Sequence, residues 1–69
     1  MFALYEVVKL RVQKAPNLPV GTQGTILIIY NEPSLPLAYE VEFLDDLGNT
    51  LAIMTLKEQE IEKINPLAK

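Results

Sequence analysis

The stretch Tyr39-Glu40-Val41-Glu42-Phe43 decides the fold class, because large apolar side chains alternate there with carboxylates at every second position. Side chains along a β-strand point to the two faces of a sheet in turn, so this pattern predicts a strand with a dry inner face and a wet outer face. A helix would need apolar residues at intervals of three and four. The rest of the chain is therefore expected to supply strands that pair with this one.

Further strand patterns occur on both sides of this stretch. Strands are expected at 5–12, 22–30, 39–43, 50–56 and 61–64, with a helical turn at 57–60. The segments 13–21 and 31–37 carry two prolines each and are expected to be loops, as is 45–49, where Gly48 suits a hairpin turn. Gly24 marks a place for a bend or bulge, and Asn65-Pro66 is expected to end regular structure.

Five short strands without a long helix must close on themselves or pack as a small sandwich. The long first loop, long second strand, hairpin, helical turn and short last strand predict an all-β, five-stranded SH3-like barrel, a single domain over residues 1–69. The phase of strand 50–56 stays open, because Leu51 and Ile53 are as apolar as their neighbours. The side chains expected to face inward are Val8, Leu10, Val12, Ile26, Ile28, Tyr39, Val41, Phe43, Ala52, Met54 and Ile61.

The composition narrows the possible functions. The chain of 69 residues has no cysteine, which removes disulfide frameworks and thiolate metal sites and favours a reducing cytoplasm. Its longest apolar run, Ile26–Tyr30, is far shorter than the roughly 20 residues of a membrane-spanning helix, so no membrane association is expected. A net charge of −3 with only six basic residues disfavours nucleic acid as a partner.

Catalysis is not expected, because the chain has neither histidine nor cysteine. Glu40 and Glu42 share one face of a strand and form a candidate acid and base pair. The favoured interpretation is that they are the solvated face of an amphipathic strand. No catalytic residue, cofactor or metal ligand is therefore assigned.

Four other patterns have a structural interpretation beside a functional one. Asp45-Asp46 with Asn49 resembles part of a calcium-binding loop, but these residues are also typical of turn capping, which is the favoured interpretation. Gly21 and Gly24 resemble a phosphate-binding loop, but such a loop is followed by a helix and this segment is followed by an expected strand. Lys9 and Arg11 are a candidate phosphate clamp, although pairing with Glu60 and Glu62 across the barrel is favoured. The two Pro-x-x-Pro segments, 16–19 and 33–36, are expected to be loop prolines.

Several of these segments together carry a resemblance to a known family. The combination of Gly24-Thr25-Ile26, Tyr39–Phe43 and the turn Gly48-Asn49-Thr50-Leu51-Ala52 resembles a family of short bacterial proteins, domain of unknown function four-nine-two-six. The resemblance also includes Tyr5–Leu10, Leu18–Gln23 and Thr55-Leu56. It implies no activity and no catalytic residues. Genes of this family often neighbour short genes of toxin, immunity or unknown type, which favours a partner-binding role.

The architecture is also similar to SH3-like accessory subunits of photosynthetic and redox complexes and to the ribosomal KOW motif. This chain lacks the basic loops with which the ribosomal motif holds RNA. The ribosomal comparison therefore implies the fold, and a functional transfer from it would be an analogy.

The leading hypothesis is a non-catalytic protein-binding module, either antitoxin-like or immunity-like or an accessory subunit of a larger complex. Its expected docking surface is Leu27, Ile29, Leu44 and Leu47, which also predicts a weak homodimer in isolation. Burial of strand 22–30 on both of its faces is the alternative explanation for Leu27 and Ile29. The runner-up function is a nucleic-acid or ribosome-associated, KOW-like binding protein, and an enzyme ranks third.

Overall fold

The structure, a computed structural model, describes residues 1–64. Its elements are β1 (Val7–Leu10), β2 (Gln23–Tyr30), β3 (Ala38–Leu44), β4 (Thr50–Lys57), the 3-10 turn η1 (Glu58–Glu60) and β5 (Ile61–Lys63). The five expected strands and the helical turn before the last strand are confirmed, while the expected stop at Asn65-Pro66 lies outside the described residues. No helix in residues 1–64 is long and apolar enough to cross a membrane.

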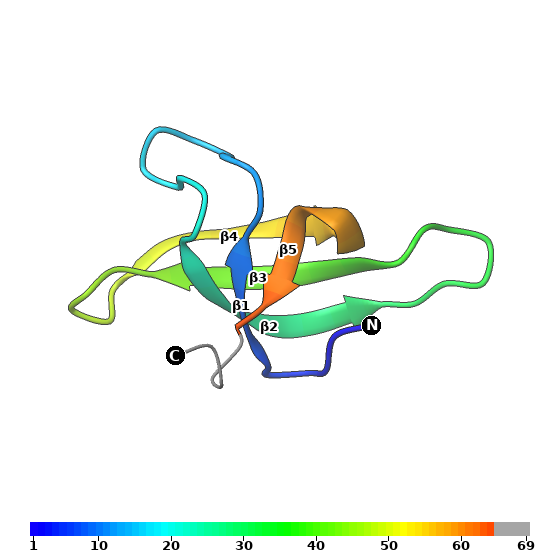
Figure 1. The fold of residues 1–69 in the computed structure, drawn as a ribbon. Helices are drawn as coiled ribbons and strands as arrows, with labels where there is room; N and C mark the ends of the chain where they lie inside the picture. The colour runs from blue at the N-terminus through cyan, green and yellow to red at the C-terminus, as the bar shows by residue number, and fades with distance from the viewer. Residues whose placement is uncertain (65–69) are drawn as a thin grey trace.

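The five strands form one antiparallel sheet in the order β4-β3-β2-β1-β5. Figure 1 shows the β1 and β5 pair running across the long strands β2, β3 and β4, which is the crossed arrangement of an SH3-like fold. The expected all-β class is confirmed. The hydrogen-bonded sheet is open, with β4 and β5 as its edges, so side chains packed between the two crossed parts complete the core.

The core contains the inward side chains of all five strands together with two from outside them. The buried residues are Phe2, Val8, Leu10, Leu18, Ile26, Tyr39, Val41, Phe43, Leu56 and Ile61. Ala52 and Met54 pack against this cluster, which answers the question of phase in β4. Leu51 and Ile53 accordingly lie on the outer face and are more than a third exposed.

Two residues expected in the core lie outside it. Val12 is 39% exposed because β1 ends at Leu10, before the alternation reaches it. Ile28 is 46% exposed because β2 contains a bulge: Ile26 lies opposite Val41, but the next paired residue on β2 is Ile28, opposite Glu40. The extra residue in between inverts the alternation for the rest of the strand.

Gly24, where the sequence suggested a bend or bulge, is instead a regular ladder position. It lies opposite Val8 on one side and Phe43 on the other. A Cβ atom at this position would come within 2.7 Å of Val41 Cγ1 and 2.8 Å of Phe43 Cδ1. Gly24 is therefore required for the close approach of core side chains over the centre of the sheet.

The loop 11–22 contributes a core side chain of its own. Ala15 and Leu18 form an isolated bridge, in which the N–H of Leu18 donates to the carbonyl of Ala15 at 2.9 Å. This tight turn inserts Leu18, which is 1% exposed, into the core. The buried Leu18 lies inside the first Pro-x-x-Pro segment, which supports its interpretation as a structural loop.

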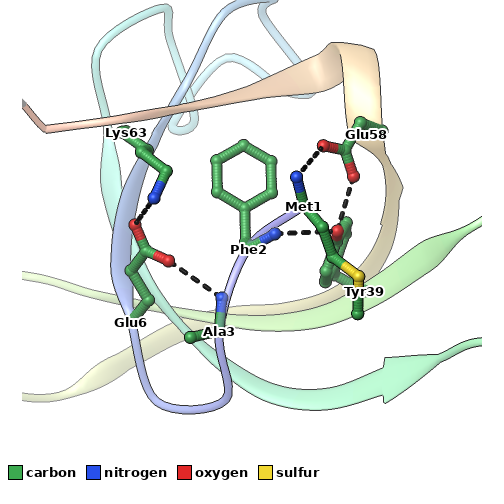
Figure 2. A network of polar contacts seen from close by, with 7 residues as sticks. All are labelled: Met1, Phe2, Ala3, Glu6, Tyr39, Glu58 and Lys63. Carbon is green, nitrogen blue, oxygen red and sulfur yellow. Dashed lines mark hydrogen bonds and ion pairs between the residues drawn. The ribbon is translucent and has the colours of Figure 1, made fainter.

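The N-terminal residues cover the core beside η1, as Figure 2 shows. The Phe2 ring packs edge-on against the ring of Tyr39, with 5.3 Å between the centroids. The backbone N–H of Phe2 donates to the Tyr39 hydroxyl at 3.0 Å, and that hydroxyl donates to Glu58 Oε1 at 2.5 Å. The second carboxylate oxygen of Glu58 lies 3.3 Å from the amino group of Met1. This network ties residues 1–2 to η1.

Candidate functional site

Two of the four side chains expected on a docking surface, Leu27 and Ile29, belong to β2. Leu27 is the extra residue of the bulge and is half-buried. Ile29 lies opposite Tyr39 and packs against the core, so its expected place on the outer face is wrong. The physical reason is the inverted alternation after the bulge.

The other two expected residues, Leu44 and Leu47, are exposed at the opposite end of the long strands. Leu44 ends β3 and is 42% exposed, and Leu47 in the following hairpin is 86% exposed. Figure 1 shows this hairpin at one end of the sheet and the loop 31–37, which follows β2, at the other. The structure therefore divides the four residues between two regions.

A groove of about 730 Å³ lies beside Leu44, on the outer face of the sheet. Its walls are the base of the loop 11–22 on one side and the hairpin after β3 on the other. The lining residues are Val7, Asn17, Gly21, Thr22, Gln23, Gly24, Thr25, Glu42, Leu44, Asp45, Asp46 and Leu51. We call this feature the hairpin groove.

The floor of the hairpin groove is a row of side chains across neighbouring strands. Val7 of β1 lies opposite Thr25 of β2, which lies opposite Glu42 of β3. Val7 is 46% exposed, and the other apolar members of the lining, Leu44 and Leu51, are 42% and 37% exposed. The groove thus carries three exposed apolar side chains, while Thr25 and the Glu42 carboxylate continue the row that begins at Val7.

Acidic groups dominate the charge of the hairpin groove, because its described lining includes Glu42, Asp45 and Asp46 and neither lysine nor arginine. The N–H of Asn49 donates to Asp45 Oδ1 at 2.8 Å, and the N–H of Leu47 does so at 2.9 Å. These backbone donors, Asn49 first, hold the pKa of Asp45 below its usual range. Asp45 therefore remains a carboxylate at neutral pH and shapes the turn, as expected from the sequence.

The candidate acid and base pair, Glu40 and Glu42, lies on the outer face of β3. The Thr55 hydroxyl donates to Glu40 at 2.6 Å and the Thr50 hydroxyl donates to Glu42 at 2.7 Å. Each carboxylate thus has a cross-strand hydroxyl partner from β4. Tyr30 lies beside Glu40, and partial desolvation followed by that carboxylate raises the pKa of Tyr30. This arrangement agrees with the interpretation of the pair as an ordered polar face.

The basic residues of β1 and its following loop meet acidic residues near β5. Lys9 lies opposite Glu62 in the ladder, as the expected cross-barrel pairing requires. Glu60 pairs with Lys14 instead, at 2.6 Å, and this hydrogen bond lowers the pKa of Glu60. At the far end of β5, Lys63 lies 3.5 Å from Glu6. Arg11 contacts Glu60 through its backbone: the N–H of Arg11 donates to the carbonyl of Glu60.

Sequence reasoning identified Leu44 and the acidic hairpin but missed Val7 and Leu51. Val7 had a weak signal, since it adds an apolar residue to the outward phase that Lys9 and Arg11 mark. Leu51 is the extra residue of a second bulge, because Phe43 lies opposite Ala52 while the next pair along the ladder is Leu44 with Thr50. Within residues 1–64, no group of three or more acidic side chains is placed to hold a metal ion.

Comparison with known proteins gives the family and nothing beyond it. Neither the curated proteins nor the solved structures provide a significant match. A family model does match, over residues 4–63, which include every strand described above and the lining of the hairpin groove. The chain therefore belongs to the family described as domain of unknown function DUF4926.

Proposed function

We propose that this chain is a non-catalytic protein-binding module that docks a partner protein in the hairpin groove. The observation that carries the proposal is that three exposed apolar side chains, Val7, Leu44 and Leu51, line a groove whose charged groups are acidic. Exposed apolar side chains rimmed by polar groups are typical of protein interaction sites. The module would serve as an antitoxin-like or immunity-like protein or as an accessory subunit.

The charge of the hairpin groove specifies the chemistry of the partner. Glu42, Asp45 and Asp46 favour a segment that carries lysine or arginine next to apolar side chains, because complementary charges steer association and fix its register. The same carboxylates repel phosphates and so oppose the KOW-like alternative. The absence of cysteine and the bacterial character of the family favour a reducing bacterial cytoplasm as the compartment.

The experiment is affinity capture from the native cytoplasm with the tagged chain, followed by measurement of binding to the purified partner. Leu44→Lys places a cation on the groove floor and is expected to abolish binding. Leu35→Lys is the matched control, because Leu35 is 63% exposed in the loop after β2 and does not line the groove. Both variants should melt like the wild type, since both side chains are exposed.

Equal affinity of the partner for both variants would place the docking site elsewhere. A partner that binds only at low salt and proves to be RNA or DNA would favour the nucleic-acid alternative. A gel shift with single- and double-stranded DNA and RNA at several salt concentrations tests this directly, since phosphate contacts weaken steeply as salt rises.

A further inference from the structure

The strand β4 is an edge of the sheet, so one of its two sides has no neighbouring strand within residues 1–64. Within residues 1–64, β3 is the strand that pairs with β4. In an antiparallel ladder, every second residue of an edge strand directs its N–H and C=O away from the neighbouring strand. Along β4 these groups form a row that another strand can pair with, up to Lys57, whose N–H already donates to Glu60 Oε1 at 2.9 Å.

The two edges of the sheet are protected very differently. The edge strand β5 has three residues, two of which are the exposed charged residues Glu62 and Lys63. Short strands and charges are the usual means by which proteins prevent edge-to-edge pairing. β4 contains no proline, its one charged residue is Lys57 at the end, and Ile53 near its middle is 51% exposed. The β4 edge is thus open to pairing with another strand, whereas the β5 edge is protected from it.

The charges at the two ends of β4 favour a second copy of this chain as the occupant. Lys57 ends the strand, while the hairpin that precedes its start carries Asp45 and Asp46. When two copies of β4 pair antiparallel, the Lys57 end of each copy meets the acidic hairpin of the other. A parallel arrangement would bring like charges together instead.

We propose that two copies of this chain pair through β4, antiparallel and about a two-fold axis, so that the two sheets join into one. A two-fold axis perpendicular to the sheet pairs one residue with itself. We assign that position to Ile53, because this register joins the most exposed apolar side chain of β4 to its own copy. The register centred on Met54 would place Leu51 opposite Lys57 instead. The sequence-based dimer at Leu27, Ile29, Leu44 and Leu47 is thereby replaced by a contact at the β4 edge.

This proposal does not depend on the proposed function, because Ile53 does not line the hairpin groove. Ile53 does lie opposite the groove residue Glu42 in the ladder, so the uncharged Ile53→Cys is the variant that separates the two proposals. The two can fail separately. Leu44→Lys tests the groove, and substitutions at Ile53 test the edge.

The natural absence of cysteine makes a disulfide test direct. Ile53→Cys, under mild oxidation of the purified protein, should form a covalent dimer, because directly opposite residues on paired strands bring their Cβ atoms within reach of a disulfide. Val20→Cys is the matched control, since Val20 is 62% exposed in the loop 11–22, away from the edge. Sedimentation velocity of the wild type should show a shift from monomer to dimer as concentration rises, and Ile53→Lys should abolish that shift while leaving the melting temperature unchanged.

Cross-linking of Ile53→Cys no faster than that of Val20→Cys would overturn the proposal, since it would reflect random collision. A wild-type monomer at every concentration would do the same. A β4 edge whose amides gain protection from hydrogen exchange only when a different protein is added would also refute pairing with a second copy.

Discussion

The Tyr39 hydroxyl donates a hydrogen bond to Glu58 Oε1 across the base of the core, and it accepts one from the N–H of Phe2. Tyr39 is fully buried, so its hydroxyl depends on these two partners. Burial first, and then the bond to Glu58, raises the pKa of Tyr39. The interaction therefore links the position of η1 and of residues 1–2 to the protonated state of one phenol.

Tyr39→Phe should lower the free energy of unfolding by about 1–3 kcal/mol, because it leaves a buried N–H without its acceptor. Because the pKa is raised in the folded state, the stabilisation is fully present below the unfolded pKa of about 10 and is lost as pH rises above it. The variant should thus show a shallower loss of stability above pH ~10 than the wild type. Urea unfolding from neutral to alkaline pH measures both effects.

Tyr5→Phe is the control, because Tyr5 is 68% exposed. Its urea midpoint should match the wild type across the range. If Tyr39→Phe also matched the wild type at neutral pH, the two hydrogen bonds of the Tyr39 hydroxyl in Figure 2 would contribute nothing to stability.

Phe43→Ala should lower the free energy of unfolding by about 3–5 kcal/mol, since it removes a fully buried ring from the centre of the core. That loss is comparable to the whole stability expected of so small a domain, so the variant should be largely unfolded at 25 °C. Circular dichroism during thermal unfolding measures it. Leu47→Ala, at a position 86% exposed, should stay within about 0.5 kcal/mol of the wild type. A wild-type melting curve for Phe43→Ala would contradict the inward phase of β3.

Gly24→Ala should destabilise the protein by about 1–3 kcal/mol through overpacking. Its new Cβ would meet the Glu42 carbonyl oxygen at 2.9 Å, and a backbone atom in the middle of a sheet has little room to move. Gly48→Ala provides the comparison, because the space there is open and only the positive φ of 85° opposes the side chain. Of the two, Gly24→Ala alone should shift the NMR signals of Val41 and Phe43. Wild-type stability in Gly24→Ala would show that β2 and β3 can separate at this point.

The strands and their inner faces were predictable where polar and apolar residues alternate, as they do from Tyr39 to Phe43. Where every residue is apolar, as in Ile26–Ile29, the pattern does not indicate which side chains face inward, so it could not reveal the bulge at Leu27. Core residues supplied by loops, such as Leu18, have no periodic neighbours to identify them.

The same limit applies to the candidate site. The acidic hairpin and Leu44 were visible as neighbours along the chain. Val7 and the base of the loop 11–22 join them only through the pairing of β1 with β2 and of β2 with β3. A groove formed by three separate segments has no local sequence signature.

Glu60→Gln should reduce the acid sensitivity of the protein. The pKa of Glu60 is lowered first by its hydrogen bond from Lys14, so its stabilisation is present above the unfolded pKa of about 4.3 and is lost as pH falls through the folded value. The contribution at neutral pH should be about 0.2–1 kcal/mol, as for other pairs near the surface. Unfolding curves at several pH values between neutral and strongly acidic measure it.

Lys14→Met should flatten the same acid limb, and combining the two substitutions should add little, because both remove one interaction. Fully additive effects of Glu60→Gln and Lys14→Met would show that the two side chains act independently.

The bulge in β2 can be tested, because a bulged and a regular strand bury different side chains after Ile26. Strict alternation from Ile26 would bury Ile28 and expose Ile29, whereas the structure exposes Ile28 and packs Ile29 against the core opposite Tyr39. Ile28→Lys should therefore change the free energy of unfolding by no more than about 0.5 kcal/mol. Ile29→Lys should lower it by several kcal/mol or prevent folding, because it brings an unpaired cation into an apolar environment. The two variants place the same residue at adjacent positions of one strand, so their composition and helix and strand propensities are matched. Thermal unfolding of both variants shows which of the two side chains faces inward. A stable Ile29→Lys together with an unfolded Ile28→Lys would contradict the bulge in β2 and would show that Ile29 lies on the outer face.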